Sequence, residues 1–458
     1  MTENREVPLG WQNVSIGNVN DYRSTSIRPS DFPGELFELY SVPSFAMGSP
    51  EIVSGSSIGS SKQVVEPGDV LLCKINPRIN RVWFVGSKGS YRQIASSEWI
   101  VVRQPMINSR YMLNYFSDGN FRTLICSEVT GVGGSLTRAQ PKKVATYPLC
   151  VPSVNEQTQI ANTLDELLAQ VDSIKTRLDA IPAILKRVRQ SVLAAAVSGR
   201  LTDDWRGSDE YENGYPVDWR QQGFSSLGEL SRGKSKHRPR NDPRLFGDKY
   251  PFVQTGEIAQ ADDDITVASK YYSDFGLAQS RLFPMGTLCI TIAANIADTA
   301  LLGMEACFPD SVVGFIADEK KCDVRFIKYI VDFNKENLEA FAPATAQKNI
   351  NLQVLNSLRF PLPELNEQNE IVQRAERFFE FASQTEQRLN IAQTRVSQLT
   401  QSILAKAFRG ELTADWREQH PELISGENSA ESLLTRIQAA RAKLEPKKRV
   451  RRKKVASA

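Results

Sequence analysis

The chain has 458 residues, of which 41% are hydrophobic and 24% charged, and its formal net charge is +3 at pH 7. This length predicts about two to four domains of ordinary size. The composition is typical of a globular chain and excludes a fibrous or wholly disordered one. The small net charge does not identify a partner, and no apolar run is long enough to span a membrane.

The cysteines and histidines give no metal-binding pattern. The 6 cysteines form no C-x-x-C pair, and the chain has only 2 histidines. Structural zinc sites need such ligands at close spacing. The polar residues 1–10 contain no apolar leader segment. We therefore expect a cytoplasmic protein in a reducing compartment, with no metal site.

Residues 1–152 are predicted to form a first globular head. Apolar runs at 69–75 and 98–103 are typical of buried strands. Arginine and lysine can contact DNA phosphates, and arginine and asparagine can also form bidentate hydrogen bonds with base edges. The polar segment that follows the first run supplies the candidate DNA contacts of this head: Lys74, Asn76, Arg78 and Arg81.

Residues 153–206 are predicted to form a long helix. Apolar side chains alternate at spacings of four and three, and this spacing is typical of a coiled-coil seam when it is sustained over several heptads. Pro182 is predicted to kink the helix near Ile181. The candidate seam positions are Ile160, Leu164, Leu167, Val171, Ile174 and Leu178.

Residues 207–363 are predicted to form a second head, with a strand at 287–293 and a helix at 323–333. Its most basic segment, 230–244, suits phosphate oxygens, although a flexible solvated loop is the alternative. A second donor-rich segment lies at 345–351. The candidate DNA contacts of this head are Arg232, Lys234, Lys236, Arg238, Arg240, Lys348 and Asn349.

Residues 364–417 repeat residues 153–206. Asn155 aligns with Asn366 and Trp205 with Trp416 without a gap, so that NEQTQI matches NEQNEI and LTDDWR matches LTADWR. A weaker likeness links the segments around Trp11 and Trp219, which indicates that most of a half-protein is duplicated. The second helix adds the candidate seam positions Ile371, Phe378, Leu389, Val396, Leu399 and Ile403.

The predicted fold class is α/β (mixed α+β), with an internal pseudo-twofold repeat. Two tandem copies of one unit can pair about such an axis, and this makes the two helices antiparallel with one head at each end. The alternative is that each helix is amphipathic and packs on its own domain. Residues 418–458 are predicted to form a short helix, 430–444, and a basic end. That end either adds non-specific attraction to DNA or stays solvated.

The sequence shows no assembled catalytic centre. Its nearest approach is Asp310, Asp318 and Lys320, which superficially match the carboxylate and lysine pattern of a metal-dependent nuclease. Such a site needs carboxylates that converge on a metal from different strands. The interval is short here, and the first head has no counterpart. The cluster GVGGS at 131–135 is more typical of a loop than of a phosphate-binding site.

The repeated segments PLPELNEQNEIV, VPSVNEQTQIANTLDELLAQVDS and LTQSILAKAFRGELTADWR resemble the specificity subunits of type I restriction-modification enzymes. AIPAILKRVRQSVLAAAV and ISGENSAESLL further resemble the type IA branch. The resemblance implies two target recognition domains, each of which binds one half of a split DNA site, and a helical spacer between them. It is specific in the helices and weak in the heads.

The resemblance also implies a non-catalytic chain that binds double-stranded DNA, two modification subunits and two restriction subunits. S-adenosylmethionine, ATP and Mg²⁺ would then serve those other subunits, with no cofactor in this chain. Two alternatives from other classes are a coiled-coil scaffold that binds only proteins, and the nuclease outlined above.

Overall fold

The computed structural model describes residues 7–127, 129, 137–208, 210–261, 263–293, 296–340 and 350–444. The chain forms two compact units. The first unit joins Met1–Leu178 to Ile391–Ala458, and the second is Asp179–Asn390. Each unit therefore combines one head with part of each long helix. Lys348, Asn349, the GVGGS cluster and the basic end of the chain lie outside the described residues.

The first head is built on two sheets. The 5-stranded sheet has the order β2-β5-β8-β3-β4, with bounds Ser26–Ile27, Lys62–Val64, Arg92–Ala95, Leu36–Tyr40 and Glu51–Ser54. The 3-stranded sheet β7-β6-β9 consists of Val82–Phe84, Val70–Cys73 and Trp99–Val102. β6 and β9 confirm the two predicted strands. The accompanying helices are α2 (Ser109–Ser117), α3 (Gly119–Ser127) and α4 (Pro141–Val144).

The second head also has two sheets. The 5-stranded sheet β14-β22-β19-β20-β16 consists of Gly228–Arg232, Val312–Ala317, Leu288–Thr291, Thr299–Leu302 and Asp264–Ile265. The 4-stranded sheet β17-β15-β21-β18 consists of Lys270–Tyr272, Phe246–Phe252, Ala306–Cys307 and Leu282–Phe283. The helices are α8 (Thr255–Gln260), α9 (Asp274–Ala278), α10 (Val324–Phe333), α11 (Lys335–Ala340) and α12 (Leu352–Ser357). β19 and α10 confirm the predicted strand and helix.

Both heads join the long helices through the same frame. In the first unit β1 (Gln12–Ser15) pairs antiparallel with β10 (Pro148–Val151) and leads into α1 (Ile16–Val19). In the second, β13 (Arg220–Gln222) pairs antiparallel with β23 (Phe360–Leu362), and α7 (Phe224–Leu227) follows. β10 and β23 each lead directly into a long helix. The sheets beyond this frame contain both parallel and antiparallel pairs, such as β3 with β8 and β3 with β4, which confirms a mixed class.

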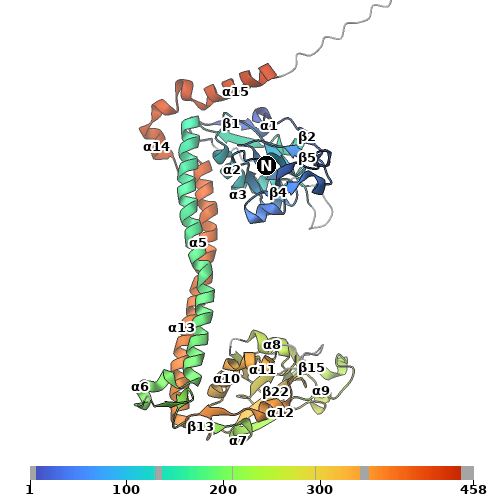
Figure 1. The fold of residues 1–458 in the computed structure, drawn as a ribbon, viewed down its shortest axis with the longest axis vertical. Helices are drawn as coiled ribbons and strands as arrows, with labels where there is room; N and C mark the ends of the chain where they lie inside the picture. Colours follow the sequence, from blue (N-terminus) through green and yellow to red (C-terminus); the bar gives the residue numbers. More distant parts are fainter. Residues whose placement is uncertain are drawn as a thin grey trace, which may run out of the picture. The chain divides into compact units, whose positions relative to one another are not determined.

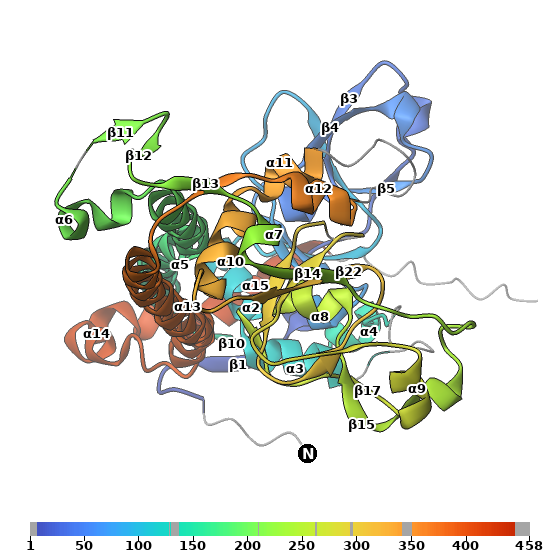
Figure 2. The same cartoon turned by 90° about the horizontal axis from the view of Figure 1, so that it is seen from below.

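The long helices are α5 (Val154–Val197) and α13 (Leu365–Phe408). They lie side by side in both views, green and orange in Figure 1 and end-on in Figure 2. Within the first unit the start of α5, at Ile160 and Leu164, shares a core cluster with the end of α13, at Leu404 and Phe408. The pair is therefore antiparallel there. α5 continues through Pro182 as a single helix.

The second unit shows the same antiparallel pairing from the other ends of the helices. Val192 and Ala196 of α5 share a core cluster with Ile371 and Ala375 of α13. Short elements follow the long helices: α6 (Asp203–Arg206) and the hairpin of β11 (Tyr211–Glu212) with β12 (Tyr215–Pro216) follow α5, whereas α14 (Ala414–Gln419) and α15 (Ala430–Leu444) follow α13. α15 confirms the predicted short helix.

The predicted seam is only partly buried. One line of positions, separated by seven residues or by twice seven, is buried on each helix, at Leu164, Val171, Leu185 and Val192 on α5 and at Ala375, Ala382 and Leu389 on α13. Ile160 and Ile371 are also buried, whereas Leu167, Leu178, Val396 and Ile403 are half-buried. Ile174, Phe378 and Leu399 are 42%, 48% and 46% exposed, so their assignment to a buried seam was wrong. With only one partner helix, the second line of each seam lies at the edge of the contact.

Glycine ends both long helices for a steric reason. Gly199 and Gly410 have φ values of 76° and 73°, which L side chains rarely adopt. A Cβ atom on Gly199 would lie 2.6 Å from Cγ of Pro216, and one on Gly410 would lie 2.6 Å from Cγ of Pro8. The head chain therefore crosses the end of each helix at the same close distance, which extends the repeat to the segments around Trp11 and Trp219.

Leu164→Ala should lower the free energy of unfolding of the first unit by about 3 kcal/mol, because it opens a cavity at a fully buried position. Ile174→Ala, on the same helix, is the matched control and should cost about 1 kcal/mol or less, since that side chain is 42% exposed. Urea denaturation followed by circular dichroism measures both. Equal losses would contradict a seam with only one buried line.

Candidate DNA interface and helix junctions

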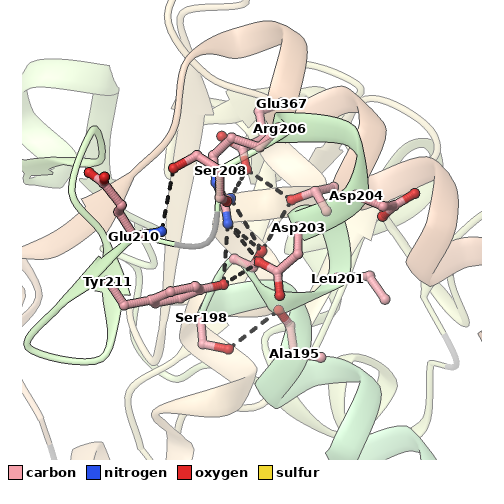
Figure 3. A network of polar contacts seen from close by, with 12 residues as sticks. Ala195, Ser198, Leu201, Asp203, Asp204, Arg206, Ser208, Glu210, Tyr211 and Glu367 are labelled. Carbon is pink, nitrogen blue, oxygen red and sulfur yellow. Dashed lines mark hydrogen bonds and ion pairs between the residues drawn. The ribbon is translucent and has the colours of Figure 1, made fainter.

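A buried carboxylate joins the two long helices in the second unit. Glu367, in the first turn of α13, is 4% exposed. Its side chain accepts hydrogen bonds from Thr202 Oγ1 at 2.8 Å, Arg206 Nη1 at 2.5 Å and Trp219 Nε1 at 3.1 Å. Figure 3 shows this network around Glu367 and Arg206. A carboxylate also suits the first turn of a helix, where the backbone N–H groups and the helix dipole favour negative charge.

Arg206 connects that carboxylate to the end of α5. Its guanidinium donates to the Gly199 carbonyl at 3.3 Å. It also pairs with Asp203 Oδ1 at 2.7 Å (Figure 3). Tyr211 hydrogen-bonds to both Asp203 and Arg206. The Arg206 side chain is only 6% exposed, so its charge depends on these acceptors.

The first unit repeats the junction. Glu156, in the first turn of α5 and 1% exposed, accepts from Thr413 Oγ1 at 2.7 Å and from Arg417 Nη1 at 2.5 Å. Arg417 Nη2 also donates to the Gly410 carbonyl at 2.6 Å. The glutamate of each NEQ motif thus accepts hydrogen bonds from the threonine and the arginine of the other repeat's LTxDWR motif. One difference lies at Trp11, whose Nε1 is buried without a partner among the described residues.

The neighbouring glutamine of each NEQ motif attaches the long helix to its head. Gln368 accepts from the Asp323 N–H at 2.9 Å, and Asp323 is the N-cap of α10. Gln157 accepts from the N–H of Asn108, the N-cap of α2, at 2.8 Å. Each glutamine also donates to the carbonyl of the proline five residues before it, at 2.9 Å in both cases. The sequence shows these motifs as repeats, but it contains no signal for these contacts.

The candidate DNA contacts of the first head lie on the turn between β6 and β7. Arg78 is exposed on a 3-10 turn, Pro77–Ile79, and Lys74 is half-buried. Asn76 has a φ of 48°, and its Oδ1 is buried without a hydrogen-bond partner among the described residues. Arg81 donates to the Ile75 carbonyl at 3.4 Å, so it holds the turn in shape. These positions make Arg78 the most accessible of the three cations.

In the second head the basic segment gathers around one carboxylate. Arg240 Nη2 contacts Asp310 Oδ1 and Oδ2 at 2.9 and 3.0 Å, and Arg238 Nη2 lies 4.0 Å from Oδ2. Arg232 Nε donates to the backbone carbonyl of Asp310. Lys234 and Lys236 are exposed beside them. A strand-end carboxylate thereby holds several exposed cations together, and phosphate oxygens could replace or join it.

A second carboxylate, that of Asp242, contacts the other end of the same segment. His237 Nε2 lies 2.7 Å from Asp242 Oδ2, and Arg244 Nη2 lies 2.8 Å from the same oxygen. The Arg244 guanidinium and the backbone N–H of Arg244 lower the pKa of the Asp242 carboxyl well below its usual range. Asp242 therefore holds His237 and Arg244 together at this end of the segment.

The nuclease pattern is not assembled. Asp310 and Asp318 lie at opposite ends of β22, Val312–Ala317, and a strand of this length separates its ends by roughly 20 Å. Asp310 contacts the arginines of the basic segment, whereas Asp318 Oδ2 pairs with Lys321 Nζ at 3.0 Å. Two carboxylates so far apart cannot bind one metal ion, and Lys320 follows only the second.

Comparison with known proteins decides the family. Residues 216–393 match the family described as type I restriction modification DNA specificity domain. The chain is 35% identical over 356 residues to the StySPI specificity subunit of Salmonella potsdam, covering 76% of this chain and 75% of the relative. The chain belongs to the specificity subunits of type I restriction enzymes. As one of these, it is a DNA sequence-specificity subunit, which confirms the resemblance seen in the helices.

Other relatives agree with this membership. The EcoBI specificity subunit of Escherichia coli is 37% identical over 319 residues, which are 67% of each chain. The HsdS subunit from Thermoanaerobacter tengcongensis shares the fold, with a TM-score of 0.61 at 18% identity over 90% of this chain and 100% of that chain. A chain from a structure of type I R-M complex assembly gives a TM-score of 0.74 at 19% identity, covering 89% of this chain and 99% of that one. Among the described residues of this specificity subunit, no helix combines the length and the hydropathy that a membrane span requires.

Glu367→Gln should lower the free energy of unfolding of the specificity subunit by about 3 kcal/mol, since it removes the buried anion of the Arg206 cation and leaves it only the more exposed Asp203. Glu364→Gln, an exposed position just before the helix, is the matched control and should change stability little. Urea denaturation of the second unit checks both. A loss that is the same in the two variants would contradict the junction.

Arg238→Ala with Arg240→Ala should weaken DNA binding by the assembled subunit and flatten the slope of log K against log salt by about two phosphate contacts. Arg388→Ala with Arg395→Ala, two exposed arginines on α13, removes the same charge elsewhere as the control. Fluorescence anisotropy over a salt series measures both slopes. A slope unchanged by the first pair would exclude the basic segment from the DNA interface.

Proposed function

We propose that this specificity subunit recognises a split, asymmetric DNA site, with one half contacted by each head. The observation that carries the proposal is that the same junction and frame are built twice, while the heads attached to them differ. The first head has a 5-stranded and a 3-stranded sheet, and the second a 5-stranded and a 4-stranded one. Two different surfaces on one repeated frame suit two different half-sites.

The long helices set the gap between the half-sites in this proposal. Two half-sites whose centres are one helical turn of DNA apart, ~34–36 Å, lie on the same face of the duplex. The basic segments would fix the register of each head on the phosphates, and a few arginine, asparagine and glutamine side chains would recognise bases. Arg78 in the first head and Lys234, Lys236 and Arg238 in the second are among the exposed cations that support this role.

The subunit itself carries no catalytic group in this proposal. Modification subunits would bind S-adenosylmethionine and methylate adenine, and restriction subunits would use ATP and Mg²⁺ to translocate and cut DNA. We propose two copies of each, because the chain is a twofold repeat. The half-exposed apolar side chains Ile174, Phe378 and Leu399 support docking of partners on the long helices, since a monomer rarely leaves such lines uncovered.

A methylome tests the function directly. The chain is co-expressed with its modification subunit in an unmethylated host, and N6-methyladenine is mapped across the genome. We expect one split motif with a fixed gap and different halves, lost when this chain is omitted. A well-formed complex that gives no motif would contradict DNA recognition and favour a protein-binding scaffold. A symmetric motif would contradict the assignment of one distinct half-site to each head.

A further inference from the structure

The 4-stranded sheet of the second head borders a cavity of about 420 Å³, a volume that is ordinary for a small-ligand site. Three aromatic side chains line it, namely Phe246 and Phe252 of β15 and Tyr272 of β17. The register of the two strands shifts so that Phe246 and Tyr250 both pair with Tyr272. The centroids of the Phe246 and Phe252 rings lie 5.7 and 4.1 Å from that of Tyr272. The cavity therefore has a wall of packed aromatic rings.

Most of the remaining lining is polar. Ser235, Arg240 and Asn241 come from the basic segment 230–244, and Lys270 comes from β17. The other polar side chains of the lining are those of Gln254, Thr255 and Ser311. Amides and hydroxyls both donate and accept hydrogen bonds, as the edge of a planar polar ligand requires. No carboxylate belongs to the described lining.

The border of the cavity has a surplus of positive charge. Arg240 contacts both carboxylate oxygens of Asp310, at 2.9 and 3.0 Å, so these two charges offset each other. Lys270 has no carboxylate partner among the described residues, and its Nζ lies 5.7 Å from the centroid of the first of the three rings. Lys234 and Lys236 are exposed and likewise have no carboxylate partner in the described part of the chain. Three lysines are therefore available to an anion.

We propose that this cavity binds one nucleobase of the half-site at the second head, turned out of the DNA duplex. The proposal rests on the proposed function, because it needs DNA at this head. Inside a duplex both faces of a base are covered by its neighbours, so ring side chains can stack only on a base that has left the stack. The amides and hydroxyls would contact the edge of that base, and the lysines the phosphates beside it.

The combination of rings, amides and cations favours a nucleotide over other ligands. An apolar ligand would leave the buried ends of the amides and hydroxyls without partners, and an inorganic anion would make no use of the rings. DNA is favoured over a free nucleotide because Lys234 and Lys236 lie next to the lining residue Ser235 in the chain but outside the lining itself. A DNA strand supplies phosphates on both sides of the bound base, and these can reach lysines outside the cavity.

Fluorescence anisotropy with the assembled methyltransferase, on duplexes that carry the motif found in the methylome, tests the stacking contact. Phe246→Leu keeps an apolar side chain at this half-buried position but removes the ring. It should weaken binding to the intact motif about tenfold, because the base loses its stacking partner. On a duplex that lacks the base at one particular position, the same substitution should have no effect. Phe333→Leu, 45% exposed on α10 and outside the lining, is the matched control and should bind every duplex as the parent does.

Three results would contradict the proposal. An equal loss on every abasic duplex would make Phe246 a structural residue. A position whose whole effect is reproduced when uracil replaces thymine would indicate a contact with the methyl group of a base within the groove. Binding of a free deoxynucleoside monophosphate, with no coupled position in the duplex, would assign the cavity to a free nucleotide. In each case a parent complex that still prefers its motif leaves the proposed function standing, whereas one that does not distinguish the motif from a scrambled duplex overturns both.

A second measurement does not depend on a buried ring. Asn241→Ala with Gln254→Ala removes two amides of the lining, one exposed and one half-buried. The methylome of this variant should show one degenerate position in one half of the motif, at the position that couples to Phe246. Gln260→Ala with Gln353→Ala removes two exposed amides of the same head outside the lining, and it should leave the motif as it is. A motif that the first pair of substitutions does not change would overturn base recognition by this cavity.

Discussion

A carboxylate buried in the first turn of each long helix is the interaction on which the rest of the structure depends. Glu156 and Glu367 each accept hydrogen bonds from a threonine and an arginine of the segment that follows the other long helix. A buried anion is costly unless every acceptor is used, so the cross-repeat pairing admits one register of the antiparallel helices. That register fixes where each helix ends and where each head chain crosses it.

The junctions explain why the repeat is strong in some segments and weak in others. A glutamate, a glutamine, a threonine, an arginine and a left-handed glycine are each required twice, because each makes a specific contact in both units. The sheets beyond β1–β10 and β13–β23 must only bury an apolar face against the frame. They are therefore free to differ in strand number and in the loops that face solvent, and a change of DNA target needs this freedom.

The repeat is nevertheless completed in two ways. The first unit uses the chain's own C-terminal helix α15 to cover α1, whereas in the second unit the chain after α6 forms the β11–β12 hairpin. The two repeats therefore share one frame but differ in the segment that packs against it.

The sequence alone determined the duplication, the two long helices, the mixed class and the strands β6, β9 and β19, because periodicity and self-similarity are local properties of the chain. It did not determine which of the two apolar lines of each helix is buried: Ile174 and Phe378 fit the heptads as well as Val171 and Ala382. Only the tertiary structure decided this, since burial depends on how many neighbours a helix has. It also decided that Glu367 meets Arg206 and that Asp310 lies far from Asp318, because contacts between distant segments depend on how the strands and helices pack.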